Sequence, residues 1–132
     1  MPNIVLCYPI QERQLEWIRR ALPAEWQIIN AGQDGIAEAI LEADVFCGHA
    51  KVPVPWKTVV KNGRLKWIQS SAAGLDHCLT PEVVHSSIKV SSCSGLFANQ
   101  VAEQTLALLY GWHRQLPTCL LYTSPSPRDL LK

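Results

Sequence analysis

Residues 65–77 read LKWIQSSAAGLDH and join an apolar run to a stretch of very small residues. The run 65–69 is typical of a buried strand, and the small residues and glycine after it leave the backbone bare. One interpretation is an ordinary strand-to-helix turn in which Asp76 caps the next turn. The other is a concavity lined by consecutive backbone amides, which suits an anion such as a carboxylate. The stretch alone favours the ordinary turn.

Strand and helix patterns alternate along the rest of the chain. Apolar runs predict strands at 3–8, 26–31, 43–48, 65–70 and 88–92. Helices are predicted at 11–22, 34–41 and 56–61, and another begins at Pro81 with Thr80 as its N-cap. A long apolar helix is predicted at 98–116, ended by Pro117. This alternation predicts an α/β fold with a flavodoxin-like, doubly wound, parallel five-stranded sheet and a long C-terminal helix.

Ligands of open parallel sheets bind outside the carboxyl ends of the strands. Residues 48–51, 70–77 and 91–99 all follow predicted strands, so we expect them to gather at that edge. The last segment also enters the long helix, where free amides and the helix dipole favour negative charge. The sequence therefore predicts a site for an anion at this edge.

Composition excludes several classes of function. The chain has 132 residues, 48% of them hydrophobic, and a net charge of +1. Its Lys and Arg residues are scattered, which argues against nucleic-acid or anionic-membrane binding, and no apolar run approaches the roughly 20 residues of a membrane span. The five cysteines form no C-x-x-C pair and the histidines lack metal-ligand spacing. We expect a cytoplasmic protein with reduced thiols, no bound metal, and a first strand rather than a signal peptide at its N-terminus.

Two motifs together resemble a known family. LKWIQSSAAGLDH, then a helix start, then IKVSSCSGLFANQVAEQTLALLYGWHRQLP (residues 88–117), is similar to the N-terminal half of the D-isomer-specific 2-hydroxyacid dehydrogenases. The resemblance covers residues 1 to about 117. It implies half of a two-domain enzyme: a substrate domain, with residues 98–116 as the helix that crosses to a Rossmann domain binding NAD or NADP.

The resemblance also implies roles for individual residues. Ala73 and Gly74 match the loop whose backbone amides hold the substrate carboxylate. His49 and Ala50 match a loop lining the same cleft. Asn99 matches a position that faces substrate or cofactor in some members of the family. The implied substrate is a small 2-oxo or 2-hydroxy acid of the glyoxylate, hydroxypyruvate or phosphoglycerate type.

Cofactor binding and catalysis are expected to lie elsewhere in the complete enzyme. Thr105 lies on the crossing helix, near the cofactor in some relatives, and is the one candidate cofactor contact. The family's catalytic Arg, Glu and His and its G-x-G-x-x-G fingerprint follow the crossing helix, and this sequence contains no such fingerprint. We therefore expect a truncated chain, without the Rossmann domain, that binds no cofactor alone and is inactive alone. The full-length enzyme is expected to be a homodimer, and this chain to self-associate.

The C-terminal residues and two alternative functions complete the expectations. Residues 118–132, TCLLYTSPSPRDLLK, resemble translated sequencing-adapter sequence, so we expect a non-native or disordered tail. One alternative is a free-standing flavodoxin-like binding or regulatory module. Another is thiol catalysis by Cys93 with His49 or His77 as base. The competing interpretation of Cys93, which we favour, is an ordinary buried thiol at the end of a strand.

Overall fold

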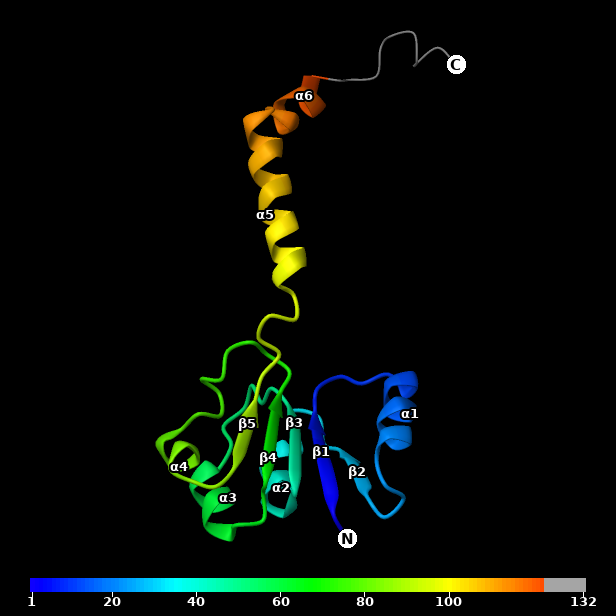
Figure 1. Ribbon diagram of the computed structural model, residues 1–132, viewed down its shortest axis with the longest axis vertical. Coiled ribbons are helices and arrows are strands. Elements are labelled where there is room, and N and C mark those ends of the chain that lie inside the picture. Colours follow the sequence, from blue (N-terminus) through cyan, green and yellow to red (C-terminus); the bar gives the residue numbers. More distant parts are fainter. Residues whose placement is uncertain (123–132) are drawn as a thin grey trace. The chain divides into compact units, whose positions relative to one another are not determined.

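The computed structural model describes residues 1–122, which divide into two compact units, Met1–Ser94 and a second unit that begins at Gly95. The second unit contains α5 (Ala98–His113) and α6 (Leu116–Tyr122). The first unit alternates strands and helices (Figure 1): β1 (Asn3–Cys7), α1 (Glu12–Ala21), β2 (Gln27–Asn30), α2 (Ile36–Ala39), the 3-10 helix η1 (Ile40–Glu42), β3 (Val45–Gly48), α3 (Trp56–Asn62), β4 (Trp67–Ser70), α4 (Pro81–Val84) and β5 (Lys89–Ser91).

The five strands form one parallel sheet in the order β2-β1-β3-β4-β5. This is the strand order of flavodoxin-like sheets, so the predicted fold class is confirmed. The pairing register places Val5, Phe46, Ile68 and Val90 in one row across β1, β3, β4 and β5. Because side chains alternate between the faces of a strand, this row lies on a single face.

That face carries the hydrophobic core. Val5, Phe46 and Ile68 are fully buried, and the core continues into α2, η1, α3 and α4. The buried side chains that these helices contribute are Ile36, Ile40, Trp56, Val59 and Val83. The helices after β2, β3 and β4 therefore form the layer that closes this side of the sheet.

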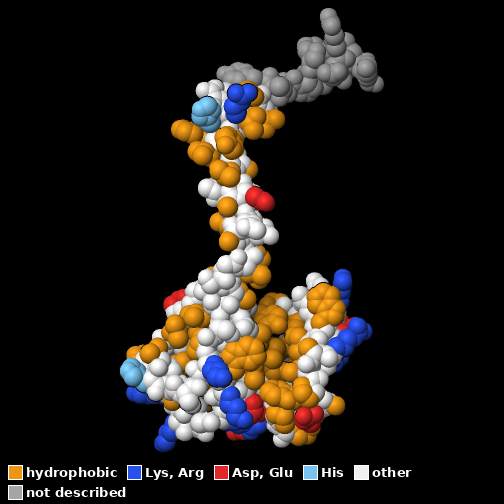
Figure 2. Space-filling model, viewed as in Figure 1, with side chains coloured by type: hydrophobic (Ala, Val, Ile, Leu, Met, Phe, Trp, Pro, Cys, Tyr) orange, Lys and Arg blue, Asp and Glu red, His pale blue; other side chains and the backbone are white. Residues whose placement is uncertain are grey.

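The opposite face is covered less completely. α1 stands at the β2 side of the sheet (Figure 1) and contributes no buried residue, although Leu15 and Ile18 of its predicted apolar face are half-buried. Trp67, next to the buried Ile68 on β4, is 43% exposed. Figure 2 shows hydrophobic side chains on the visible surface of this unit.

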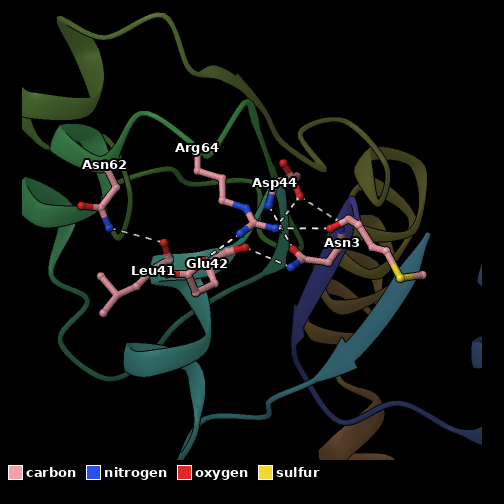
Figure 3. Close-up of polar contacts among 7 residues, drawn as sticks. Asn3, Leu41, Glu42, Asp44, Asn62 and Arg64 are labelled. Atoms are coloured by element: carbon pink, nitrogen blue, oxygen red, sulfur yellow. Dashed lines mark hydrogen bonds and ion pairs between the residues drawn. The ribbon is translucent and has the colours of Figure 1, made fainter. Parts of the chain in front are cut away.

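Polar contacts hold the sheet at its amino-terminal edge (Figure 3). Asn3 at the start of β1 and Asp44 before β3 bond each other's backbone amides, both at 3.0 Å. The Asn3 side chain also donates to the carbonyl of Glu42 at 2.9 Å, and Arg64 forms ion pairs with Glu42 at 2.7 Å and Asp44 at 3.2 Å. This network joins β1, β3 and the segment entering β4, at the end of the sheet away from the candidate site.

The long C-terminal helix ends earlier than its sequence predicts. α5 stops at His113, and Gln115 adopts a left-handed φ of 51°. Pro117 lies within the first turn of α6, where its missing N–H leaves no hydrogen bond unmade. The prediction that Pro117 ends the helix is therefore wrong, since the break precedes it. Residues 118–122 belong to α6, and the remainder of the predicted tail, 123–132, lies outside the described residues.

The second unit consists of helices with an exposed surface. Every residue of α5 except Gly111 is exposed, and apolar side chains line much of its length (Figure 2). Its N-cap position is Phe97, so Asn99 does not cap the helix. In the part of the chain that the structure describes, no helix is both long and apolar enough to cross a membrane.

Candidate functional site

The loops after β3, β4 and β5 lie together at the carboxyl edge of the sheet. The amide of Ser71 donates to the carbonyl of Gly48 at 3.2 Å, which joins the β4 loop to the end of β3. The amide of Cys93 donates to the carbonyl of Ala72 at 3.1 Å, which joins the β5 loop to the β4 loop. The three strand-end segments that the sequence singled out therefore meet here as far as Ser94, where the first unit ends.

A buried serine shapes the start of the β4 loop. The hydroxyl of Ser70 accepts the amide of Ala72 at 3.0 Å and lies 3.2 Å from the same residue's carbonyl oxygen. Ser70 is fully buried, so this small local turn is fixed by the sheet itself. The turn uses the amide of Ala72 and ends the strand ladder immediately before Ala73 and Gly74.

The backbone amides that directly follow Ala72 in the β4 loop donate no hydrogen bonds in the described structure. Within residues 1–122, no hydrogen bond is donated by the amides of residues 73–77, and the bonded amides resume at Cys78 and Leu79, which both donate to Leu75 O. Ala73 and Gly74 are exposed. A run of exposed, unbonded N–H groups is the arrangement that binds an anion such as a carboxylate. The loop therefore has free backbone donors at Ala73 and Gly74.

Asp76 lies against the same loop. A Cβ atom added to Gly74 would lie 3.0 Å from the Asp76 Oδ1 atom, so a larger residue here would require the exposed Asp76 side chain to shift. In the described residues Asp76 makes no hydrogen bond that caps the following turn, so the capping interpretation finds no support. Its negative charge would oppose an anion at Gly74 by Coulomb repulsion.

Two imidazoles join the β3 loop to the β4 loop. The rings of His49 and His77 are stacked, with centroids 4.1 Å apart and an interplanar angle of 13°. Both ring nitrogens of His77 are buried and have no hydrogen-bond partner among residues 1–122. Burial lowers the pKa of His77, the neighbouring His49 lowers it further, and Asp76 opposes the shift. The ring of His77 is therefore held in its neutral form at neutral pH.

Gln33 fixes the β3 loop from a neighbouring turn. Its amide nitrogen donates to the carbonyls of Cys7 and His49, both at 2.9 Å, and its side-chain oxygen accepts the amide of Lys51 at 2.8 Å. The sequence analysis missed this residue. The one local signal is its place in the turn after β2, next to Gly32 with its φ of 61°.

The structure locates the other candidate residues as follows. His49 is half-buried, whereas Ala50 is 6% exposed and its side chain belongs to the core, so Ala50 can offer a ligand its backbone only. Asn99 and Thr105 are exposed residues of α5 in the second unit, and the Thr105 hydroxyl donates to Val101 O at 2.8 Å. The roles given to these four residues stay predictions.

Neither a metal centre nor a catalytic thiol is assembled in the described part of the chain. Among residues 1–122, no three His, Cys, Asp or Glu side chains are grouped so as to hold a metal ion. The Cys93 thiol lies 3.3 Å from Ser70 O and 3.9 Å from the Gln69 side-chain nitrogen. No described contact joins this thiol to a histidine.

Comparison with known proteins gives matches to solved structures. No protein-family model and no curated protein sequence matches the chain. The crystal structure of phosphoglycerate dehydrogenase from Lactobacillus plantarum superposes with a TM-score of 0.57 and 20% identity, covering 90% of this chain and 37% of that one. The PH0520 protein from Pyrococcus horikoshii OT3 superposes with a TM-score of 0.66 and 22% identity, covering 92% of this chain and 36% of that one. This chain thus spans little more than a third of either protein, and identities this low show a shared α/β fold alone.

Proposed function

We propose that this chain is the substrate domain of an NAD(P)-dependent dehydrogenase acting on small 2-hydroxy acids, and that it binds the carboxylate of the acid. The observation that carries the proposal is the run of unbonded amides at Ala73 and Gly74, exposed at the carboxyl edge of the sheet. Two consecutive amides can donate to the two oxygens of one carboxylate. The fold, shared with a structure described as phosphoglycerate dehydrogenase, is compatible with this role.

We do not expect the described residues to bind the cofactor by themselves. In a dinucleotide-binding domain, glycines follow the first strand, whereas here β1 runs into Tyr8 and Pro9. NAD or NADP, which in the proposed reaction exchanges a hydride with the C2 carbon of the acid, is therefore assigned to the second domain of a longer enzyme. The catalytic Arg, Glu and His of the family would come from that second domain as well. This chain contributes binding and orientation of the acid.

The proposal extends to the organisation of the complete enzyme. Residues 1–117 would form the substrate domain, with residues 98–116 crossing to the Rossmann domain. The exposed apolar surface of α5 supports a contact with that domain or with a second subunit. We place the complete enzyme in the cytoplasm as a homodimer.

NMR spectroscopy of the 15N-labelled chain tests the carboxylate site. D-lactate is titrated into the chain, and lactamide serves as the control because it has the same shape without the negative charge. We expect saturable shifts of the Ala73 and Gly74 amide resonances with lactate, at a dissociation constant on the order of millimolar, and no such shifts with lactamide. If neither lactate nor glyoxylate moves these two resonances, the proposal is wrong.

Two substitutions of Ala73 distinguish the contribution of its backbone amide to carboxylate binding from that of its side chain. Ala73→Pro removes the proposed donor without breaking any hydrogen bond in the described structure, whereas Ala73→Ser retains the donor. We expect the proline variant to lose the lactate-dependent shift at Gly74 and the serine variant to keep it. Equal binding by both variants would show that the carboxylate sits elsewhere.

A further inference from the structure

We propose that the stacked rings of His49 and His77 form a proton-sensitive latch between the loops that follow β3 and β4. The latch is closed while both rings are neutral, and protonation opens it. It controls the local order of the loops that carry the candidate carboxylate site.

The geometry of the pair supports a contact between loops rather than a local turn. The two histidines come from loops on neighbouring parallel strands, and their rings lie nearly parallel at 4.1 Å. The carbonyl of His77 accepts the indole N–H of Trp56 at 3.2 Å, and the carbonyl of His49 accepts the side chain of Gln33 at 2.9 Å. Each ring is thus attached to a backbone that is already held from another element.

The nitrogens of His77 make the latch sensitive to protons. Neutral imidazole has one N–H donor and one acceptor, and here both nitrogens are buried without a partner. A proton on this ring adds a charge and a second donor that has no acceptor in the described structure. A second proton on the pair adds repulsion between two cations at stacking distance. Each step favours separation of the rings, which lets water reach the nitrogens.

The charged groups around His77 do not cancel this effect. Asp76, on the same loop, favours the protonated ring, but burial and His49 together outweigh it and the pKa of His77 stays below its ordinary value. α3 presents the uncharged Trp56, and Lys57 on that helix interacts with Glu82 of α4. Cys78, which follows His77, is a neutral thiol at these pH values because burial raises its pKa to about 11.

The latch would regulate the proposed carboxylate site. Only its effect on ligand binding rests on the proposed function, because the ring stacking itself does not require a ligand. Ala73 and Gly74 lie in the loop that His77 holds, so opening the latch would change the arrangement of their amides. The test measures the loops directly and includes no 2-hydroxy acid ligand. A negative result for the latch therefore does not contradict the carboxylate site, and a negative lactate titration does not contradict the latch.

Hydrogen exchange and NMR titration of the full chain test the latch. Between about pH 7.5 and pH 5, we expect amide exchange of Cys78 and Leu79, the bonded amides of the β4 loop, to rise ~10-fold or more after correction for the intrinsic rate, with exchange in β1 and β3 unchanged. The ring resonances of His77 should titrate below the ordinary pKa of a histidine. Loop exchange that follows only the intrinsic rate would overturn the latch.

Phenylalanine variants identify the rings responsible. His77→Phe keeps a stacking ring without titratable nitrogens and should abolish the excess exchange at low pH. His49→Phe should move the His77 titration upward, because burial still lowers the pKa of His77 but the contribution of His49 is gone. His85→Phe, on an exposed histidine outside the pair, should behave as the unchanged chain. If His77→Phe retains the excess exchange, or if His49→Phe leaves the His77 titration unmoved, the proposal is wrong.

Discussion

Asn3 and Asp44 form a reciprocal pair in which each side chain accepts the other residue's backbone amide, both at 3.0 Å (Figure 3). Arg64 adds a third contact, 3.2 Å from the Asp44 carboxylate. Burial raises the pKa of Asp44, but the amide of Asn3 and the guanidinium of Arg64 outweigh it and hold the pKa below its ordinary value. The ionised carboxylate is therefore part of what joins β1 to β3.

Asp44→Asn should lower the free energy of unfolding at neutral pH by about 1–3 kcal/mol, since it weakens hydrogen bonds to a charged, largely buried group. Because the pKa of Asp44 is lower in the folded chain than in the unfolded one, its contribution is complete above about pH 4 and is lost as pH falls through the folded pKa. Urea unfolding as a function of pH measures both effects. In Asp44→Asn, the free energy of unfolding should not show the loss at low pH that protonation of Asp44 causes.

Glu42→Gln is the matched control, because Glu42 pairs with the same Arg64 but its side chain is 74% exposed. An exposed ion pair contributes little, so we expect a change within about 0.5 kcal/mol. Equal losses for the two variants would mean that Arg64, rather than the Asn3–Asp44 pair, carries the stabilisation.

Gly48→Ala should be among the most destabilising small substitutions in the chain. Gly48 ends β3 with a φ of 140°, and an added Cβ would lie 3.0 Å from the backbone carbonyl carbon of Cys7. Strain and the clash together should cost more than about 3 kcal/mol, measured by urea unfolding. Gly63→Ala is the comparison, because Gly63 also has a positive φ but open space around it, and about 1–2 kcal/mol is expected there. Similar costs at both sites would contradict the close packing of β3 on β1.

The fold was predictable because its signals are local. Each strand is a short run rich in Val, Ile or aromatic residues, bounded by prolines, glycines or polar turns, and all five were located to within two residues of their observed ends. The end of α5 was not predictable in this way. Pro117 is a helix breaker in the interior of a helix but acceptable in a first turn, and only the left-handed Gln115 shows which applies.

The candidate site was predictable only in part. The small residues at 70–74 indicated a bare backbone, and in the structure the amides of Ser71 and Ala72 are bonded whereas those of Ala73 and Gly74 are not. The stacking of His77 on His49 and the three bonds of Gln33 depend on side chains brought together by strand pairing, which no spacing in the sequence encodes. The burial of Ala50 is likewise a result of packing between layers.

The cysteines should differ in their reactivity with iodoacetamide. Burial raises the pKa of Cys78 to about 11, with Asp76 adding to the shift, and burial also raises the pKa of Cys7. Both are fully buried, whereas Cys119 is exposed. Because the thiolate is the reactive form, we expect mass spectrometry of the native chain at about pH 8 to show Cys119 modified first. Cys7 and Cys78 should react only in denaturing urea, and rapid modification of either in the native chain would contradict the packing of the first unit.

Self-association should depend on the apolar surface of the second unit. An apolar groove of about 620 Å³ lies between α5 and α6, lined in part by Leu108, Trp112 and Leu116. Leu108 and Trp112 are 64% and 78% exposed, and clustered apolar surface of this kind drives association in water. We expect the molar mass from light scattering to rise with protein concentration.

The double variant Leu108→Lys, Trp112→Lys should stay monomeric over the same range. Val84→Lys, at a similarly exposed but isolated position on α4 in the first unit, should associate as the unchanged chain does. If the α5 double variant associates as strongly as the unchanged chain, the contact lies on the first unit, where the exposed Trp67 of β4 marks the next surface to substitute.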